Sequence, residues 1–274
     1  MPGKQTSGIK LDYYTFDDTP LTFVRVEHPD LRDEFLTMLF FEHNEIPPEG
    51  STLDEFREFF NRIGSYSQND DGTVVAEQDM WTLKFIPAAD AVDLELRVRN
   101  KTDRDWHDLV SVTGCVSPLG WGVWRLHGVP RDESPYAAPT FADRETRDKT
   151  YISTEDGPFL LASRAKHFFD QQTLDRVLAL PYKTNVFRVE EHKAAPPFVD
   201  RGIIVRCNRE NGWVLGYGWE DTLCVNANNP LDCLHPTVRI GPLKAGSEKM
   251  IRGKVYLFQG TIQDAFDRYD GDLK

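Results

Sequence analysis

Short segments in which apolar and polar residues alternate recur along most of this chain. The clearest covers residues 92–99, where Val92, Leu94, Leu96 and Val98 face one way and charged residues face the other. Such alternation is typical of a strand with one buried face. The same reasoning predicts further strands at residues 13–16, 21–26, 73–76, 81–86, 109–116, 203–207, 213–219, 222–226, 238–240 and 249–258, with another beginning at Thr150.

Turn-forming residues at 100–103, Asn-Lys-Thr-Asp, separate the strand at 92–99 from the strand at 109–116. We therefore predict that these two strands form an antiparallel hairpin. Helical patterns are few, at residues 52–63, 174–180 and 261–269. Many strands without alternating helices indicate an all-β fold, a two-sheet antiparallel supersandwich with a few short helices, in a single domain over residues 1–274.

The segment LELRVRNKTDRDWHDLVSVTGCVSP, residues 94–118, resembles the central hairpin of the galactose mutarotase-like superfamily. The resemblance implies a two-sheet supersandwich with a sugar-sized cleft on a concave sheet. In aldose epimerases of that superfamily, a His at the end of the second strand acts as the general acid, and a Glu late in the chain acts as the general base. Here Thr113-Gly114-Cys115 stands in place of that His, and Glu220 and Glu248 are the late glutamates.

Composition and charge narrow the classes of partner. The net charge of −12 disfavours nucleic acid, which requires clustered Lys and Arg. We also expect no membrane partner, because no run of apolar residues is long enough for a transmembrane helix and the N-terminal residues lack a signal-peptide pattern. The four cysteines are widely spaced, which favours reduced thiols in a cytoplasmic protein. The oligomeric state is left open.

The candidate site is the stretch at residues 213–235, where an aromatic strand is followed by a Trp-Glu-Asp step and a turn that carries Cys and His. In a sugar enzyme we expect Glu220 to act as the base and His235 as the acid, with Asp221 as a further catalytic carboxylate. Trp219 and Trp213 offer flat aromatic surfaces on which a sugar ring could stack.

A long charged loop at residues 126–147 supplies two more candidates. Arg144 could clamp polar groups of a ligand, and His127 is a second binding residue in the same loop. A solvated surface loop with weak ion pairs is the alternative.

Metal binding is a separate possibility. Cys233 and His235 have a spacing that is compatible with zinc, but the sequence identifies no third or fourth ligand. Cys115, together with Asp105 and His107, is a second set of possible metal ligands. We therefore expect no cofactor and keep a metal site as an alternative. Motifs of serine hydrolases, dinucleotide-binding proteins, NTPases and zincins are missing from the sequence.

These observations favour a protein that binds or acts on a sugar, either a small molecule or an oligosaccharide, in a concave-sheet cleft. If it is an enzyme, acid–base isomerisation or bond cleavage is the expected chemistry. The alternatives are a non-catalytic module for sugar binding or subunit interaction, and a metal-dependent enzyme that uses Cys233 and His235.

Overall fold

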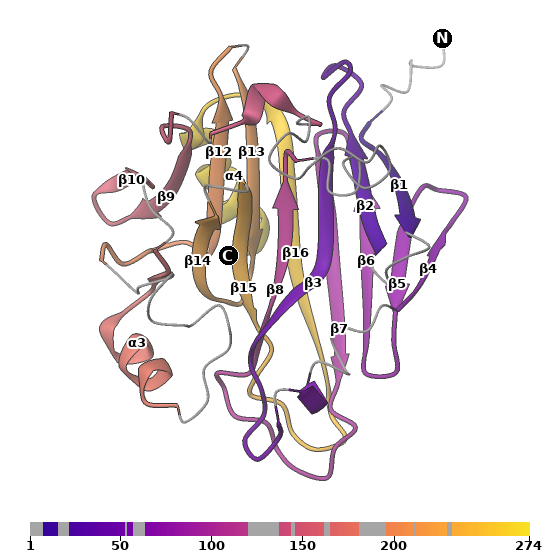
Figure 1. Cartoon of the computed structure of the whole chain (residues 1–274), viewed down its shortest axis with the longest axis vertical. Helices are drawn as coiled ribbons and strands as arrows, with labels where there is room; N and C mark the ends of the chain where they lie inside the picture. The colour runs from indigo at the N-terminus through magenta and orange to yellow at the C-terminus, as the bar shows by residue number, and fades with distance from the viewer. Residues whose placement is uncertain are drawn as a thin grey trace.

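Two antiparallel sheets pack face to face, with their strands running along the long axis of the molecule (Figure 1). The computed structural model describes residues 8–15, 22–52, 54–56, 64–119, 137–143, 146–161, 165–180, 196–210, 212–228 and 232–274. This arrangement confirms the all-β, two-sheet fold predicted from the sequence. The seven-stranded sheet contains, in spatial order, β1 (Lys10–Thr15), β2 (Thr22–Glu27), β3 (Leu36–Ile46), β8 (Ser111–Ser117), β15 (Cys233–Arg239), β14 (Thr222–Asn228) and β11 (His167–Phe168).

The nine-stranded sheet forms the second layer. Its order is β10 (Gly157–Leu160), β9 (Thr150–Thr154), β12 (Ile203–Asn208), β13 (Trp213–Trp219), β16 (Glu248–Gln259), β7 (Ala91–Arg99), β6 (Trp81–Pro87), β5 (Val74–Glu77) and β4 (Ser65–Gln68).

The main core fills the space between the sheets. On β7 the four apolar residues of the predicted alternation are all buried, and they pack in one cluster with Val112 and Val116 of β8 and Leu234 of β15. Each such side chain contributes roughly 1.5–3 kcal/mol by leaving water. The alternation therefore predicted correctly which face of β7 is buried.

The predicted hairpin between residues 92–99 and 109–116 is wrong. Strand β7 pairs with β6 and β16 in the nine-stranded sheet, whereas β8 pairs with β3 and β15 in the seven-stranded sheet. The intervening segment is held by Asn100, whose amide nitrogen donates to the carbonyls of Arg104 and Leu243 at 2.9 and 3.0 Å. The turn therefore carries the chain from one sheet to the other.

Helices α3 (Gln171–Leu178) and α4 (Ile262–Leu273) lie where two helices were predicted. Asp170 caps α3, and Thr261 forms a capping box with Asp264 at the start of α4. Helix α4 covers the face of the nine-stranded sheet that points away from the core, as Figure 1 shows behind β12 and β13.

Of the helix predicted at residues 52–63, residues 54–56 are helical, and most of the remainder lies outside the described residues. A 3-10 turn covers Pro139–Phe141. In the described part of the chain, no helix has the length and apolar character needed to cross a bilayer.

Candidate functional site

The seven-stranded sheet has a second face, turned away from the core, which we call the outer face. In an antiparallel sandwich such a face usually meets solvent and carries exposed polar residues. Here the central strands β8 and β15 are buried along nearly their whole length, on both faces. Their outward-facing residues are nonetheless polar or sulfur-containing: Ser111, Thr113, Cys115 and Ser117 on β8, and Cys233, His235 and Thr237 on β15.

The register of the strands determines which side chains are neighbours on the outer face. Leu234 pairs with Val116 and Thr237 with Thr113, so the same register places Cys115 opposite His235. On the other side of β15, Asn226 of β14 pairs directly with His235. Residues opposite each other in an antiparallel pair point to the same face. Cys115, His235 and Asn226 therefore form one row across three strands.

Two glutamates reach the outer face from β3. Glu42 and Glu45 are three positions apart, so a regular strand would point them to opposite faces. The pairing of β3 with β8 is irregular between Leu39 and His43, and again between Asn44 and Ile46. Such β-bulges add residues to one strand and redirect its side chains. As a result, Glu42 contacts His235 and Glu45 contacts Thr113.

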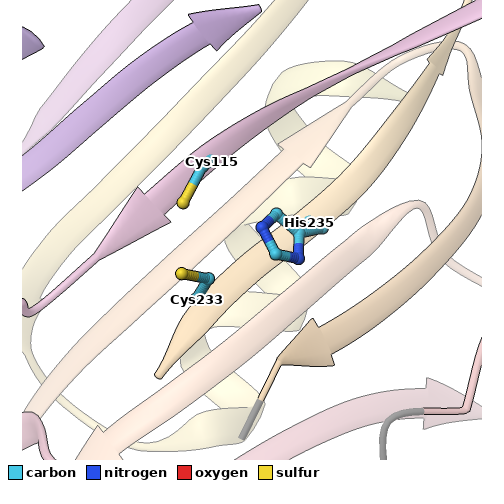
Figure 2. A group of neighbouring side chains, drawn as sticks. All are labelled: Cys115, Cys233 and His235. Carbon is cyan, nitrogen blue, oxygen red and sulfur yellow. The ribbon is translucent and has the colours of Figure 1, made fainter. Parts of the chain in front are cut away.

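Four side chains converge in what we call the outer-face cluster: Cys115, Cys233, His235 and Glu42. The ligand atoms of the two cysteines and the histidine all lie within 4.8 Å of one another. The Nε2 atom of His235 is 2.8 Å from Oε2 of Glu42. In Figure 2, one nitrogen of the His235 ring is turned towards the two sulfur atoms. Tyr14, Phe23 and Leu39 supply apolar surroundings for the two cysteines.

Close contact sets the protonation states of the cluster. Burial alone would lower the pKa of His235, but the Glu42 carboxylate and the Cys233 thiol outweigh it and raise that pKa above its ordinary value. Burial also works against the thiolate of Cys233, yet hydrogen bonds with Cys115 and His235 lower its pKa. Burial raises the pKa of Cys115. These contacts therefore favour an imidazolium at His235 and a thiolate at Cys233, next to the Glu42 carboxylate.

A second buried polar group lies beside the cluster. Lys166 Nζ is 3.0 Å from Glu45 Oε2, and both side chains are almost completely buried. The hydroxyl of Thr113 donates to Glu45 Oε1 at 2.8 Å and lies 2.9 Å from the hydroxyl of Thr237. The charges of the outer face are thus matched in pairs, Glu42 with His235 and Glu45 with Lys166.

The structure does not bring the predicted catalytic pair, Glu220 and His235, together. Glu220 follows β13 of the nine-stranded sheet, where its carboxylate accepts bonds from Arg252 at 2.7 and 2.9 Å. Asp221 bonds to Lys249 at 2.8 Å, and its carbonyl accepts from the backbone of Arg239. Since Arg239 is four residues beyond His235 on β15, it lies roughly 13 Å away along the strand. Of the three predicted catalytic residues, only His235 belongs to the cluster.

The two predicted aromatic platforms belong to the core. Trp219 is completely buried, with its indole nitrogen bonded to the hydroxyl of Tyr217 at 2.9 Å. Trp213 is 2% exposed, and its ring makes a T-shaped contact with the ring of His28. Neither can stack on a sugar, because both rings face the space between the sheets. The predicted binding residues Arg144 and His127 lie outside the described residues.

Sequence reasoning missed Cys115 and Glu42 as partners of His235. As a possible metal ligand, Cys115 was grouped with Asp105 and His107, which have other partners in the structure: Asp105 bonds to Lys244, and His107 Nε2 lies 3.0 Å from the carbonyl of Pro47. The signal that could have found Cys115 is its position on β8, where Ser, Thr and Cys alternate with two valines and a glycine. Glu42 gave no such signal, because β3 was not predicted.

Comparisons with known proteins assign no family. No protein-family model and no curated protein sequence matches the chain. Among solved structures, the fold is similar to a "putative aldose 1-epimerase" from Escherichia coli K12, with a TM-score of 0.42 and 10% identity over 92% of this chain and all of that one. This likeness is too distant to carry an argument about family or function. Fold and site together define a two-sheet antiparallel β-sandwich with a buried thiol, imidazole and carboxylate cluster on one outer face.

Proposed function

We propose that this protein binds a small, uncharged, hydroxyl-rich ligand of the carbohydrate class on the outer face of the seven-stranded sheet, next to Asn226. The observation that carries the proposal is the state of the Asn226 side chain. It is only 1% exposed, and its Oδ1 atom has no hydrogen-bond partner in the part of the chain that the structure describes. Leaving a buried carbonyl unpaired costs about 1–3 kcal/mol, so native proteins seldom keep one without a use.

A hydroxyl group is well suited to such an amide. The amide oxygen of Asn226 is an acceptor, so a sugar hydroxyl could donate a hydrogen bond to it. Within the outer-face cluster the side chain of Glu42 keeps the most exposure, 16%, and the proposal requires the ligand to enter from that side. Asn226 lies in the row with His235, so a ligand bound to it would lie over β14 and β15.

The charges of the outer face favour a neutral ligand. Its two glutamates are each paired with a cation, Glu42 with His235 and Glu45 with Lys166, so neither cation is left to attract an anion. The net charge of −12 adds a general repulsion of anionic sugars. The acid–base chemistry that the sequence suggested is not carried into this proposal, because Glu220 and His235 do not meet.

Calorimetric titration with neutral hexoses and disaccharides, compared with uronates of the same size, tests this proposal. We expect a neutral sugar to bind, uronates to bind at least ten-fold more weakly, and Asn226→Leu to abolish binding. Asn100 is the matched comparison for stability, because this buried amide is fully bonded. Asn100→Leu should destabilise the fold, whereas Asn226→Leu should not.

Two results would contradict the proposal that a sugar binds at Asn226. One is the absence of sugar binding to the unmodified protein, in which case Asn226 holds only an ordered water. The other is unchanged sugar affinity in a folded Asn226→Leu protein.

A further inference from the structure

The outer-face cluster contains the donor atoms of a metal site. Two sulfurs and an imidazole nitrogen lie within 4.8 Å of one another, and a carboxylate oxygen lies 2.8 Å from the Nε2 atom of that imidazole. The donors come from three adjacent strands, β3, β8 and β15, so the sheet itself fixes their positions. Sequence spacing had offered two of them, Cys233 and His235, and the fold supplies the other two.

We propose that Cys115, Cys233, His235 and Glu42 hold one Zn²⁺ ion in four-coordinate geometry. This goes beyond sugar binding and does not depend on it. Thiolate and imidazole ligands favour zinc over magnesium or calcium, which prefer oxygen. In a tetrahedral site with Zn–S near 2.3 Å and Zn–N near 2.0 Å, donor atoms stand about 3.5–3.8 Å apart. The two sulfurs and the imidazole nitrogen, within 4.8 Å of one another, need to move by only about 1 Å to reach that geometry, and Glu42 would bring its carboxylate to the ion from its contact with His235.

A disulfide fits the two cysteines less well than a shared metal does. Both are reduced in the structure. Because Cys115 lies opposite His235, Cys233 is its diagonal neighbour across the strand pair. Diagonal positions in an antiparallel pair are about 7–8 Å apart, beyond the Cα separation that a disulfide normally spans. A metal ion bridges such a diagonal because each sulfur needs to reach only the ion.

A role as a catalytic nucleophile also fits these cysteines less well than metal binding does. A Cys–His pair in catalysis needs a thiolate that substrate can reach, and Cys115 and Cys233 are both completely buried. A metal ion needs only a narrow path, which the partial exposure of Glu42 provides. When Zn²⁺ binds, the protons still carried by the two cysteines and by the His235–Glu42 pair are released to solvent, and nitrogen, sulfur and oxygen lone pairs bind the ion.

The test uses the whole chain, purified under reducing conditions and stripped with a chelator. Zinc stoichiometry is measured by elemental analysis after equilibration, and affinity by competition with a chromogenic chelator. Replacement by Co²⁺ then reports the ligands, because thiolate coordination gives a charge-transfer band and tetrahedral geometry gives intense visible bands. We expect one ion per chain and a cobalt spectrum that shows both features.

Variants identify the ligands. Cys115→Ser and Cys233→Ser should each weaken zinc binding at least 100-fold, and Glu42→Gln at least ten-fold. Cys224→Ser is the matched control, because Cys224 is equally buried on the same sheet but pairs with Thr237 outside the cluster. It should bind zinc as the unmodified protein does.

Three results would overturn the proposal: no stoichiometric zinc in the unmodified protein, a cobalt spectrum without thiolate bands, or equal zinc affinity in the Cys115→Ser and Cys224→Ser proteins. If a serine variant fails to fold, the cobalt spectrum of the unmodified protein still decides. Failure here leaves sugar binding at Asn226 untouched, and Asn226→Leu should retain zinc, so the two proposals fail separately.

Discussion

His235 and Glu42 are 193 positions apart in the sequence, yet His235 Nε2 lies 2.8 Å from Glu42 Oε2. They do not belong to neighbouring strands, because β8 lies between β3 and β15. Adjacent strands are about 4.8 Å apart, so the two side chains meet only by reaching across β8. The β8 residue opposite His235 is Cys115, which is small enough to leave room for this contact.

Enlarging Cys115 should therefore separate His235 from Glu42. We expect Cys115→Leu to lower the free energy of unfolding by about 1–3 kcal/mol, because extra methylene groups in a packed site force neighbouring side chains to move. Cys115→Ala removes a thiol without adding volume and serves as the control, with a smaller loss. Urea denaturation measures both. Equal stability of the Leu and Ala variants would show that Cys115 does not limit this contact.

The buried pair of Lys166 and Glu45 gives a second prediction. Lys166→Met leaves the Glu45 carboxylate buried without its cation, and we expect a loss of about 3–5 kcal/mol. The double variant with Glu45→Gln removes both charges and should recover much of that loss, since Gln can still accept from Thr113. Chemical denaturation of both variants at pH 7 gives the two values. A double variant no more stable than the single one would mean that charge is not the cause.

Acid should weaken the fold through His28. Burial lowers the pKa of His28 below its ordinary value of 6.5, while the nearby Asp30 and Asp90 oppose that shift in part. The unfolded chain therefore takes up a proton near pH 6.5, but the folded chain does so only at lower pH. Stability from neutral His28 is fully present above pH 6.5 and is lost as pH falls through the folded pKa.

Urea denaturation from pH 7.5 to pH 5 checks this sign. The unmodified protein should lose more stability on acidification than His28→Gln, and the difference should begin near pH 6.5. A parallel decline in the two proteins would show that His28 does not contribute.

Local sequence patterns predicted the buried faces of strands but not their partners. Alternation in residues 92–99 correctly marked the core side of β7, yet it carried no information on which sheet β7 joins. The turn at Asn100–Asp103 looked like a hairpin because its residues suit a sharp reversal and a crossover equally well. Strand pairing depends on contacts far apart in sequence, which a local pattern does not contain.

The candidate site illustrates the same limit. Cys233 and His235 were found because they are two positions apart, although they lie on β15 and not in the predicted turn. The turn was predicted from the Asn-Asn-Pro run at residues 228–230, of which residues 229 and 230 lie outside the described residues. Glu42 could not be predicted from the sequence, because the direction of its side chain depends on the irregular pairing between β3 and β8. Trp219 was misjudged because an aromatic residue on a strand looks the same whether it faces the core or a ligand.

The core role of Trp219 gives the last prediction. Gly253 pairs with Trp219 across β13 and β16, and a Cβ atom added at Gly253 would overlap the indole ring. We expect Gly253→Ala to push this ring from its place, to cost about 1–3 kcal/mol in stability and to shift tryptophan fluorescence. Gly271 is the control, because it lies in α4, where a Cβ atom added to it would meet nothing within 4 Å beyond the backbone of its own helix. Since alanine favours a helix more than glycine does, Gly271→Ala should stabilise the protein by up to about 1 kcal/mol. Unchanged fluorescence and stability in Gly253→Ala would mean that the Trp219 ring can move without cost, and its place in the core would then need to be reconsidered.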